Sequence, residues 1–299
     1  MNKLSIKTRR EIRKIFELFC YLAPTFAGLI LFQYVPFFTA IKNSFYDYNL
    51  INPAAKRFIG LKNFNRLFAD TRFWQSLGRT MLFAVCVVLL LLLISLPLAL
   101  LVKKSTVLNS IVRSAAFLPM VTAVTIIAII FNMMLDPVNG IFNTIQDKIG
   151  IGKQPFLTSG TQALKVIMFM TVWFETGFCM LVFIGGLNNI SDEYYEAAEI
   201  DGATHLQKFF YITLPLLKRM ILFVVMSQTI FSFTVFSTVY VMTRGGPMDS
   251  TRVIVYHIYE QGFKYLEMGY ASAMSIIVIV VMIIFALIES KILQTKTEY

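Results

Sequence analysis

The sequence predicts an all-α, polytopic membrane protein with six transmembrane helices. Hydrophobic residues make up 57% of the 299 residues, and only 15% of the residues are charged. In a soluble domain about a quarter of the residues are charged, so this composition indicates an integral membrane protein. The chain also contains six charge-poor runs, each long enough as a helix to cross a hydrocarbon core of about 30 Å. These runs leave no room for a large soluble domain.

The first run, Leu18–Ile41, follows a basic segment, residues 1–17, that holds six lysines and arginines. A basic lead before an apolar run is also typical of a secretory signal peptide, whose apolar part has about 7–15 residues. Here the run has 24 residues without a charge and lacks a clear small-residue cleavage site. We therefore predict an uncleaved first span, with Pro24 and Pro36 as the candidate positions for a bend.

Five further runs complete the predicted membrane domain, residues 18–290, and a short tail, residues 291–299, follows it. The runs are Thr80–Val102, Ser114–Leu135, Val166–Leu187, Met220–Thr243 and Met268–Ile288. Between the first two spans, Leu61–Phe68 is predicted to form a short interfacial helix. Between the third and fourth spans, Asp136-Pro137 and Asn139-Gly140 are typical turn sequences. No linker or internal repeat divides the spans into separate domains.

The distribution of basic residues predicts that both termini lie in the cytoplasm. With this orientation the four cytoplasmic segments hold 14 lysines and arginines, and the three external segments hold 10 although they are longer in total. Cytoplasmic segments of membrane proteins carry such an excess. The first external segment, residues 46–77, works against the bias with five basic residues, so the dense N-terminal cluster decides the orientation.

The segment between the fourth and fifth spans, residues 191–215, carries five carboxylates in its first eleven residues. Ser191 is a favourable N-cap residue, and Asp192 and Glu193 would lie in the first turn, where the helix dipole favours negative charge. Gly202 would end this helix because glycine adopts the left-handed C′ conformation at low cost. A second short amphipathic stretch follows before the next apolar run. The pattern predicts a cytoplasmic helix–turn–helix that another protein can grip.

Part of this segment resembles the EAA loop of the membrane-spanning subunits of bacterial ABC importers. The matching residues are Glu196-Ala197-Ala198, then Gly202 four residues on, and Ile212-Thr213-Leu214-Pro215 after nine more, all at the spacing of the family. The resemblance implies a type I ABC importer permease fold, a bacterial cytoplasmic membrane, and a loop that docks on an ATPase. The residues that would couple to the ATPase are Glu196, Ala197, Ala198, Asp201, Gly202, Ile212, Leu214 and Pro215.

The chain contains no nucleotide-binding motif of its own. The phosphate-binding sequence Gly-x-x-x-x-Gly-Lys-Ser/Thr does not occur in it,. The resemblance implies that the chain is a transporter subunit rather than an enzyme, and that ATP and magnesium bind to a separate ATPase subunit. We therefore expect no catalytic residues and no cofactor in this chain.

The remaining composition argues against metal, disulfide and nucleic-acid sites. Cys20, Cys86 and Cys179 all lie inside apolar runs, and two histidines, His205 and His257, are too few for a histidine-based site,. The net charge of +10 comes from basic residues scattered between the spans rather than clustered on one face, so nucleic acid is not an expected partner,.

Glu175 is a lone carboxylate near the middle of the predicted fourth span. An ionised side chain at that depth costs roughly 2.5–3.5 kcal/mol on insertion scales, so it should face a wet cavity or a partner. Trp173 and Thr176 are close to it in sequence, and an aromatic ring beside hydrogen-bonding groups suits a sugar. The alternative is a structural polar residue bonded to a neighbouring helix.

The fifth span is rich in hydroxyl, amide and aromatic side chains. Gln228, Phe231 and Ser232 are three and four residues apart and so share one helical face. The alternative is that its serine and threonine residues only mediate helix packing. In the maltose-type sugar permeases, which the chain resembles, sugar contacts come from the spans that flank the EAA loop. By offset from Glu196, the residues implied to bind sugar are Trp173, Glu175, Phe178, Gln228, Phe231 and Ser232.

Two further segments are similar to the sugar-permease branch. Thr243-Arg244-Gly245-Gly246-Pro247 resembles the T-x-G-G-P segment of these subunits, and Gly269–Ala273 resembles the small-residue entry to their last span. Small side chains at that entry permit close helix approach. Ser232 and Val235 stand where maltose-specific members have amides, so the resemblance leaves the identity of the sugar open.

Together these features predict a permease subunit of a binding-protein-dependent ABC importer for a carbohydrate. The resemblance implies as partners a second, different permease subunit, two copies of an ATPase and an external sugar-binding protein, besides membrane lipid. Two alternatives from other classes are an ion-gradient-driven secondary carrier that uses Glu175 and a membrane scaffold without transport activity. The expectation of only one carboxylate among the spans, of no inverted repeat and of no paired broken helices argues against the carrier, and the polar fifth span has no evident use in a scaffold.

Overall fold

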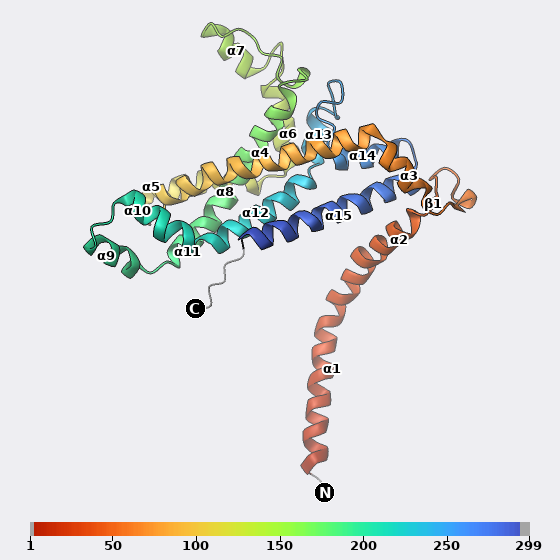
Figure 1. Cartoon of the computed structure of the whole chain (residues 1–299), viewed down its shortest axis with the longest axis horizontal. Coiled ribbons are helices and arrows are strands. Elements are labelled where there is room, and N and C mark those ends of the chain that lie inside the picture. The colour runs from red at the N-terminus through yellow and green to blue at the C-terminus, as the bar shows by residue number, and fades with distance from the viewer. Residues whose placement is uncertain (1–2, 294–299) are drawn as a thin grey trace. The chain divides into compact units, whose positions relative to one another are not determined.

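The computed structural model of the chain describes residues 3–293 (Figure 1). Contacts group these residues into two compact units. The first unit comprises the described residues up to Ala69 together with Gln261–Ile277, and the second comprises Asp70–Glu260 together with the described residues from Val278 onward. The division predicted at residues 17 and 290 follows polarity along the chain and stays a prediction. Residues 1–2 of its basic segment and 294–299 of its tail lie outside the described part.

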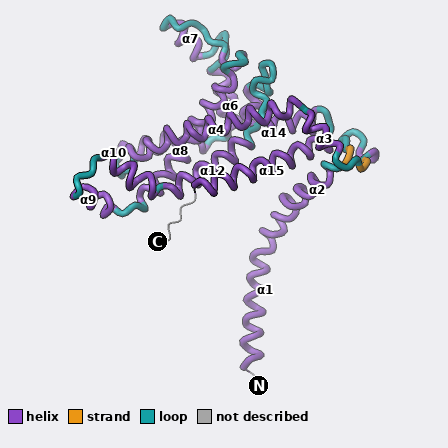
Figure 2. Tube along the Cα trace, in the orientation of Figure 1, coloured by secondary structure: helices purple, strands orange, loops and turns teal. Residues whose placement is uncertain are grey.

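Helices dominate the described residues, which confirms the predicted fold class (Figure 2). Within residues 3–293, strands occur only as one antiparallel pair, β1 (Tyr46–Asp47) and β2 (Arg57–Phe58). Four helical segments are long and apolar enough to cross a membrane, and two bent helix pairs raise the number to six if each pair forms one span. Each of the six predicted runs overlaps one of these segments, but two of the runs are not single helices.

In the first unit, the predicted first span lies within one continuous helical stretch, Glu17–Asn43. This stretch combines part of α1 (Lys3–Leu29), a π-helical turn (Ile30–Tyr34) and α2 (Val35–Asn43). The π-turn ends just before Pro36, which has no backbone N–H to donate to the preceding turn and so perturbs the α-helical hydrogen bonding. No residue of its apolar window is buried, as expected of a helix that faces lipid or another subunit,.

The rest of the first unit packs around the two strands. The predicted short helix is confirmed as α3 (Lys62–Ala69), where Asn63 donates to the backbone oxygens of Ser44 (2.8 Å) and Tyr46 (3.0 Å). The start of α15 (Met268–Leu293) lies against β1, and a Cβ at Gly269 would overlap the Tyr46 carbonyl oxygen. The predicted close approach at this small-residue segment is therefore made to a strand.

In the second unit, α8 (Ala163–Asn188) packs against α4 (Thr71–Leu101), α5 (Val107–Val121) and α12 (Lys218–Phe233) (Figure 1). The predicted fourth span is confirmed as part of α8. Fully buried apolar side chains of α4 and α8 fill the space between these helices; among them are Phe83, Leu91, Ile167, Met180 and Phe183. This core is what positions the polar residues of α8 and α12.

The predicted third span, Ser114–Leu135, is not one continuous helix, so this prediction was wrong. α5 ends at Val121, α6 (Val124–Met134) begins three residues later, and the two helices are bent by 98°. Thr122 and Ala123 have extended backbone, with ψ of 144° and 128°. Pro119 removes a backbone donor from the last turn of α5. Hydropathy records the composition of the run and not its direction, so the bend was not detected.

The predicted fifth span, Met220–Thr243, is interrupted as well. α12 ends at Phe233, and α13 (Ser237–Met242) begins after three residues. The Thr234 hydroxyl donates to the backbone oxygens of Ile230 and Phe231, both at 3.0 Å, and so competes with continuation of the helix,. At its other end α12 is bent by 64° from the preceding helical segment. The expectation that the chain lacks paired broken helices was therefore wrong.

Short elements form the segments predicted to be external. Asp136 follows α6, and its carboxylate accepts from the backbone of Asn139 (2.8 Å) and Val138 (3.0 Å). Both hydrogen bonds lower the pKa of Asp136, and the bond from Asn139 has the larger effect. They also confirm the predicted turn. α7 (Ile141–Lys148) follows, and α14 (Ile254–Tyr259) lies further along the chain.

Candidate functional site

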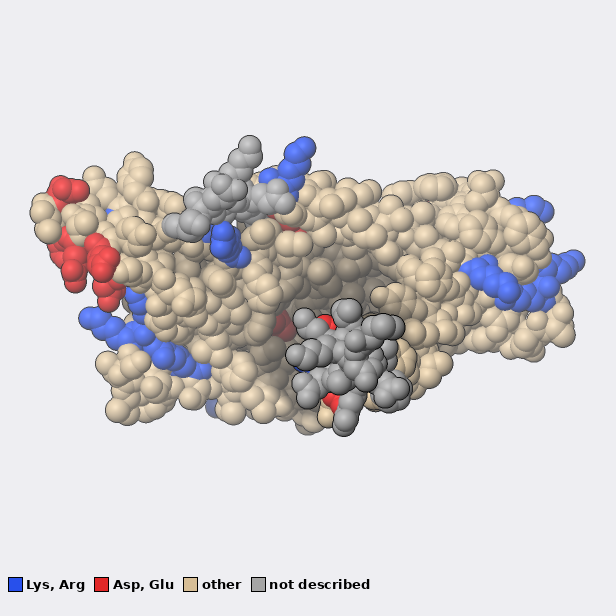
Figure 3. Space-filling view, turned by 90° about the horizontal axis from the view of Figure 1, so that it is seen from below, with Lys and Arg blue, Asp and Glu red and all other residues tan. Residues whose placement is uncertain are grey.

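The acidic segment between α8 and α12 forms an elbow, residues 191–216, of two short helical limbs. The first limb, α9 (Asp192–Ile200), begins at Ser191, whose hydroxyl accepts from the backbone N–H of Glu193 at 3.3 Å, as predicted. Acidic side chains gather at the end of the second unit where α9 lies, with basic side chains beside them (Figure 3). The elbow thus presents concentrated negative charge.

Gly202 ends α9, which confirms the prediction made for it. Its φ is +77°. The N–H of Gly202 donates to the Glu199 oxygen at 3.0 Å, and that of Ala203 donates to the Ala198 oxygen at 2.9 Å. These two bonds form a Schellman motif. A Cβ at Gly202 would meet no atom within 4 Å, so the requirement for glycine here is conformational rather than steric,.

The second limb consists of α10 (His205–Lys208), a π-helical turn (Phe209–Thr213) and α11 (Leu214–Leu216). It begins with a capping box, in which Thr204 and Gln207 exchange side-chain to backbone hydrogen bonds of 3.3 and 2.7 Å,. Both limbs are therefore capped by their own residues. Only Leu217 separates α11 from α12, so the elbow leads, across the 64° bend, into a transmembrane helix.

Most residues that the resemblance implies for ATPase coupling are accessible. Glu196, Ala197, Asp201, Gly202 and Pro215 are exposed, and Ala198, Ile212 and Leu214 are half-buried. Two apolar side chains of the elbow are also highly exposed, Ile200 at 88% and Tyr211 at 80%. The coupling role of the individual residues stays a prediction.

Within the second unit, two carboxylates flank one turn of α12. Glu175 of α8 accepts a hydrogen bond from the Gln228 side-chain amide at 3.0 Å, and both side chains are buried. Thr229, the next residue, donates to Glu289 of α15 at 2.7 Å. The expectation of a single carboxylate among the spans was wrong. Hydropathy ended the last span at Ile288, whereas α15 continues to its end at residue 293.

A cavity of about 120 Å³ lies where α12 breaks. Its lining includes four hydroxyl-bearing residues and three phenylalanines: Thr171, Thr234, Ser237, Thr238, Phe174, Phe231 and Phe236. The hydroxyl of Thr238 is buried and has no hydrogen-bond partner among the described residues. A buried hydroxyl without a partner is a group that a ligand can satisfy. Pockets that hold a drug-sized ligand measure roughly 300–1,000 Å³, so this chain alone does not enclose an oligosaccharide.

The structure distributes the six residues implied to bind sugar over different surroundings. Glu175 and Gln228 contact each other, and Phe231 lines the cavity. The Trp173 ring lies instead in an apolar groove of about 410 Å³ between α4, α5 and α8. Residues 173 and 175 differ by about 200° around a helix, so they face nearly opposite sides. The two remaining residues, half-buried Phe178 and fully buried Ser232, pack away from the cavity lining.

An aromatic cluster that sequence reasoning missed lies beside the cavity. Phe236 stacks on Tyr240 with ring centroids 5.3 Å apart, and Tyr259 lies 5.1 Å from the former and 5.5 Å from the latter. Tyr256 completes the cluster, and Tyr240 is 39% exposed. A half-exposed ring backed by other rings offers an apolar face on which sugar C–H groups stack. Phe236 and Tyr240 are separated from Tyr256 and Tyr259 by 16 residues or more along the sequence, so only the fold brings the four rings together.

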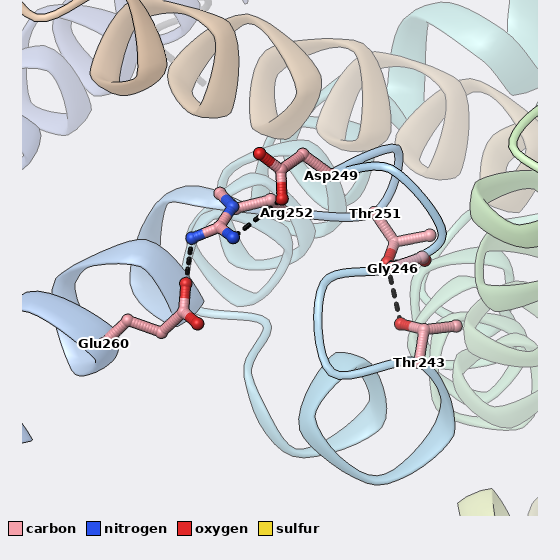
Figure 4. Close-up of polar contacts among 6 residues, drawn as sticks. All are labelled: Thr243, Gly246, Asp249, Thr251, Arg252 and Glu260. Atoms are coloured by element: carbon pink, nitrogen blue, oxygen red, sulfur yellow. Dashed lines mark hydrogen bonds and ion pairs between the residues drawn. The ribbon is translucent and has the colours of Figure 1, made fainter. Parts of the chain in front are cut away.

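The segment between α13 and α14 forms a closed loop (Figure 4). The hydroxyls of Thr243 and Thr251 lie 2.7 Å apart, and Thr251 also donates to the Gly246 oxygen at 2.7 Å. The backbone N–H of Ile254 donates to the Thr80 hydroxyl at 2.8 Å and so holds the following helix against α4. The Gly245-Gly246-Pro247 part of the T-x-G-G-P-like segment thus lies in a loop held by several hydrogen bonds.

Charged side chains reinforce the same loop. Arg252 pairs with Asp249 at 2.7 Å and also with Glu260, which is buried (Figure 4). Burial raises the pKa of Asp249, but Arg252 beside it, together with Arg72 and Arg79, outweighs burial and holds that pKa below its usual range. Asp249 is therefore ionised at neutral pH.

The sequence of the chain matches known proteins over most of its length. Residues 92–296 match the family described as binding-protein-dependent transport system inner membrane component. YurN of Bacillus subtilis, a probable ABC transporter permease protein, is 32% identical over 94% of this chain and 97% of its own. The arabinooligosaccharides transport system permease protein AraP of Bacillus subtilis is 30% identical over 92% of this chain and 87% of its own.

The fold also matches a solved structure. A chain of a bacterial ABC transporter involved in the import of the acidic polysaccharide alginate superposes with a TM-score of 0.85, over 98% of this chain and 100% of that chain, at 23% identity. At this identity the match shows a shared fold. The type I ABC importer permease fold that the EAA-like residues imply is therefore confirmed.

Proposed function

The chain belongs to the family of binding-protein-dependent transport system inner membrane components, and from this we propose that it is a permease subunit of an ATP-driven carbohydrate importer. The observation that carries the proposal is the capped, exposed acidic elbow that continues into α12. Membership of this family speaks against an ion-gradient-driven carrier and against a scaffold. The chain would lie in a bacterial cytoplasmic membrane with its termini in the cytoplasm.

In the proposed mechanism, the elbow transmits force from a separate ATPase. Two ATPase copies, which bind ATP and magnesium, would grip this elbow and that of a second permease subunit. The small residues Ala197, Ala198 and Gly202 would let the elbow sit deep in a cleft, and Glu196 would accept hydrogen bonds from donors there. Inverting an inward-to-outward equilibrium from 1:99 to 99:1 requires about 5.5 kcal/mol of differential binding, which ATP-dependent closure of the ATPases would supply.

Replacing Glu196 by alanine is expected to lower sugar uptake roughly tenfold or more while the complex still assembles, because a charge-assisted hydrogen bond to the ATPase is lost. The measurement is ATP hydrolysis and uptake in vesicles containing the complex purified through a tag on this chain. Glu193→Ala is the matched control, since Glu193 is an exposed carboxylate of the same helix outside the matching residues. Purification without an ATPase, with uptake driven by a proton gradient, would establish the carrier instead.

The cavity and the aromatic cluster support a carbohydrate as the substrate. The hydroxyl-bearing residues Thr171, Thr234 and Thr238 line the cavity together with aromatic residues at the break of α12, and sugars combine hydroxyls with apolar C–H faces. Because the cavity in this chain is small, a second permease subunit would complete the pathway. An external binding protein would deliver the sugar, as the family description implies. Calorimetry of that binding protein with arabino-, malto- and alginate oligosaccharides would identify the sugar class.

Phe231→Ala is expected to lower uptake of the identified sugar about tenfold through loss of ring stacking, without loss of complex. Trp173→Ala tests a second predicted ring, which lies in the apolar groove and not in the cavity. Phe223→Ala is the control, since Phe223 is a 52% exposed ring of α12 outside the cavity lining. A defect in Trp173→Ala with normal uptake in Phe231→Ala would move the pathway to the groove between α4, α5 and α8.

A further inference from the structure

We propose that Tyr195 is a positioning residue that transmits movement of α9 to the transmembrane helices. The proposal rests on the proposed function, because it requires an ATPase that moves the elbow. Tyr195 is half-buried, whereas its neighbours Tyr194 and Glu196 are exposed. The helix has no fully buried residue, so few contacts can carry its movement to the rest of the chain.

The first contact of Tyr195 joins the two limbs of the elbow. Its hydroxyl lies 3.0 Å from the hydroxyl of Thr213, which is buried at the end of the π-helical turn. Thr213 donates to the Lys208 oxygen at 3.4 Å, so Tyr195 donates to Thr213,. α11 and then α12 follow Thr213 directly. A displacement of α9 is therefore applied at the root of the helix that runs to the cavity.

The second contact of Tyr195 reaches the connection between α4 and α5. The ammonium group of Lys103 lies 5.6 Å from the centroid of the Tyr195 ring, within the range of a cation–π interaction,. The backbone around Lys103 is held in place, because Arg113 of α5 donates to the oxygens of Val102 at 2.9 Å and Lys103 at 2.6 Å. One side chain of α9 thus contacts both the second limb of the elbow and the connection between α4 and α5.

A further side-chain link from α9 is weaker. Glu199 pairs with Lys208 at 3.2 Å, but the Glu199 side chain is 71% exposed. An ion pair with an exposed partner is screened by water and salt and contributes little. The hydrogen bond of half-buried Tyr195 with buried Thr213 is less accessible to water, so it is the stiffer connection.

The test is a double-mutant cycle in vesicles containing the whole complex, with its ATPase and binding protein and the sugar class that calorimetry identifies. Tyr195→Phe and Thr213→Val should each lower the sugar transported per ATP hydrolysed about fivefold, because each removes the same hydrogen bond. The double variant should fall no further than either single variant. Complex yield and the binding-protein concentration at half-maximal uptake should be unchanged. Tyr194→Phe is the control, because it removes the same hydroxyl group from the exposed neighbouring residue, and it should not change the sugar transported per ATP hydrolysed.

Amide hydrogen exchange of the same complexes gives a second measurement that does not depend on transport. Exchange in α9 should be faster in Tyr195→Phe and Thr213→Val than in Tyr194→Phe. The role proposed for Tyr195 would be overturned if Tyr195→Phe left the sugar transported per ATP hydrolysed unchanged, whether or not the yield of complex fell. The proposed function as an importer subunit would not be affected by that result. Failure of an ATPase to co-purify with the unaltered chain would instead overturn the proposed function.

Discussion

Gly177→Ala is expected to destabilise the second unit, with a fall of roughly 5–10 °C in the thermal midpoint of the detergent-purified chain. A Cβ at Gly177 would overlap the Ala116 carbonyl oxygen of α5 and lie 2.7 Å from the Phe117 Cα. Both neighbours are backbone atoms, so no side-chain rotation relieves the overlap. α5 would have to move away from α8, and overpacking of this kind costs about 1–3 kcal/mol, occasionally more.

The same helix provides a matched control for this substitution. Gly185 also lies in α8, but a Cβ there would meet nothing within 4 Å. Since alanine is favoured over glycine in a helix by about 1 kcal/mol, Gly185→Ala should leave the midpoint unchanged or raise it slightly. Equal midpoints for the two variants would show that α5 and α8 do not approach each other closely at Gly177.

Local chemistry explains why the elbow was predicted well from sequence. The hydroxyl of Ser191 can only satisfy backbone donors a few residues away, and Gly202 tolerates a positive φ by itself. Both requirements act within one helical turn, so residue identity is sufficient to predict them. The apolar runs were also predictable, because the length needed to cross a membrane is a property of composition.

Features that depend on contacts between distant residues were missed. Thr122 and Ala123 are compatible with a helix, and the bend between α5 and α6 does not alter hydropathy. The pairing of Thr229 with Glu289 joins helices 60 residues apart, and the ring cluster of Phe236 and Tyr259 is closed by a loop. Trp173 and Glu175 were grouped by proximity in sequence, although the helical period places them on nearly opposite faces.

Lowering the pH from above 6.5 to below 4 is expected to destabilise the second unit by about 3 kcal/mol through His257 alone. Its side chain is buried at 1% exposure. Burial is the largest cause that lowers the pKa of His257 from 6.5 to about 4, and the Arg252 guanidinium is the next. Arg72 also lowers this pKa, whereas the carboxylates of Asp70 and Asp249 raise it. Asp70 lies 3.9 Å from the His257 Nε2, beyond hydrogen-bond distance,. Because the imidazole is neutral at neutral pH, the two residues form no ion pair there.

The sign follows from proton uptake by the two states. The pKa of His257 is lower in the folded chain, so between pH 6.5 and 4 the unfolded chain binds a proton that the folded chain does not, and the free energy of unfolding falls as the pH falls,. Asp249, whose folded pKa lies below its usual 3.8, loses its contribution to stability only at more acidic pH.

Thermal midpoints between pH 4 and 7.5 should therefore fall less steeply in His257→Gln than in the unaltered chain. His205→Gln, which removes the exposed second histidine, should retain the full pH dependence. If His257→Gln and His205→Gln showed the same slope, burial of a neutral imidazole in α14 would be excluded as its cause.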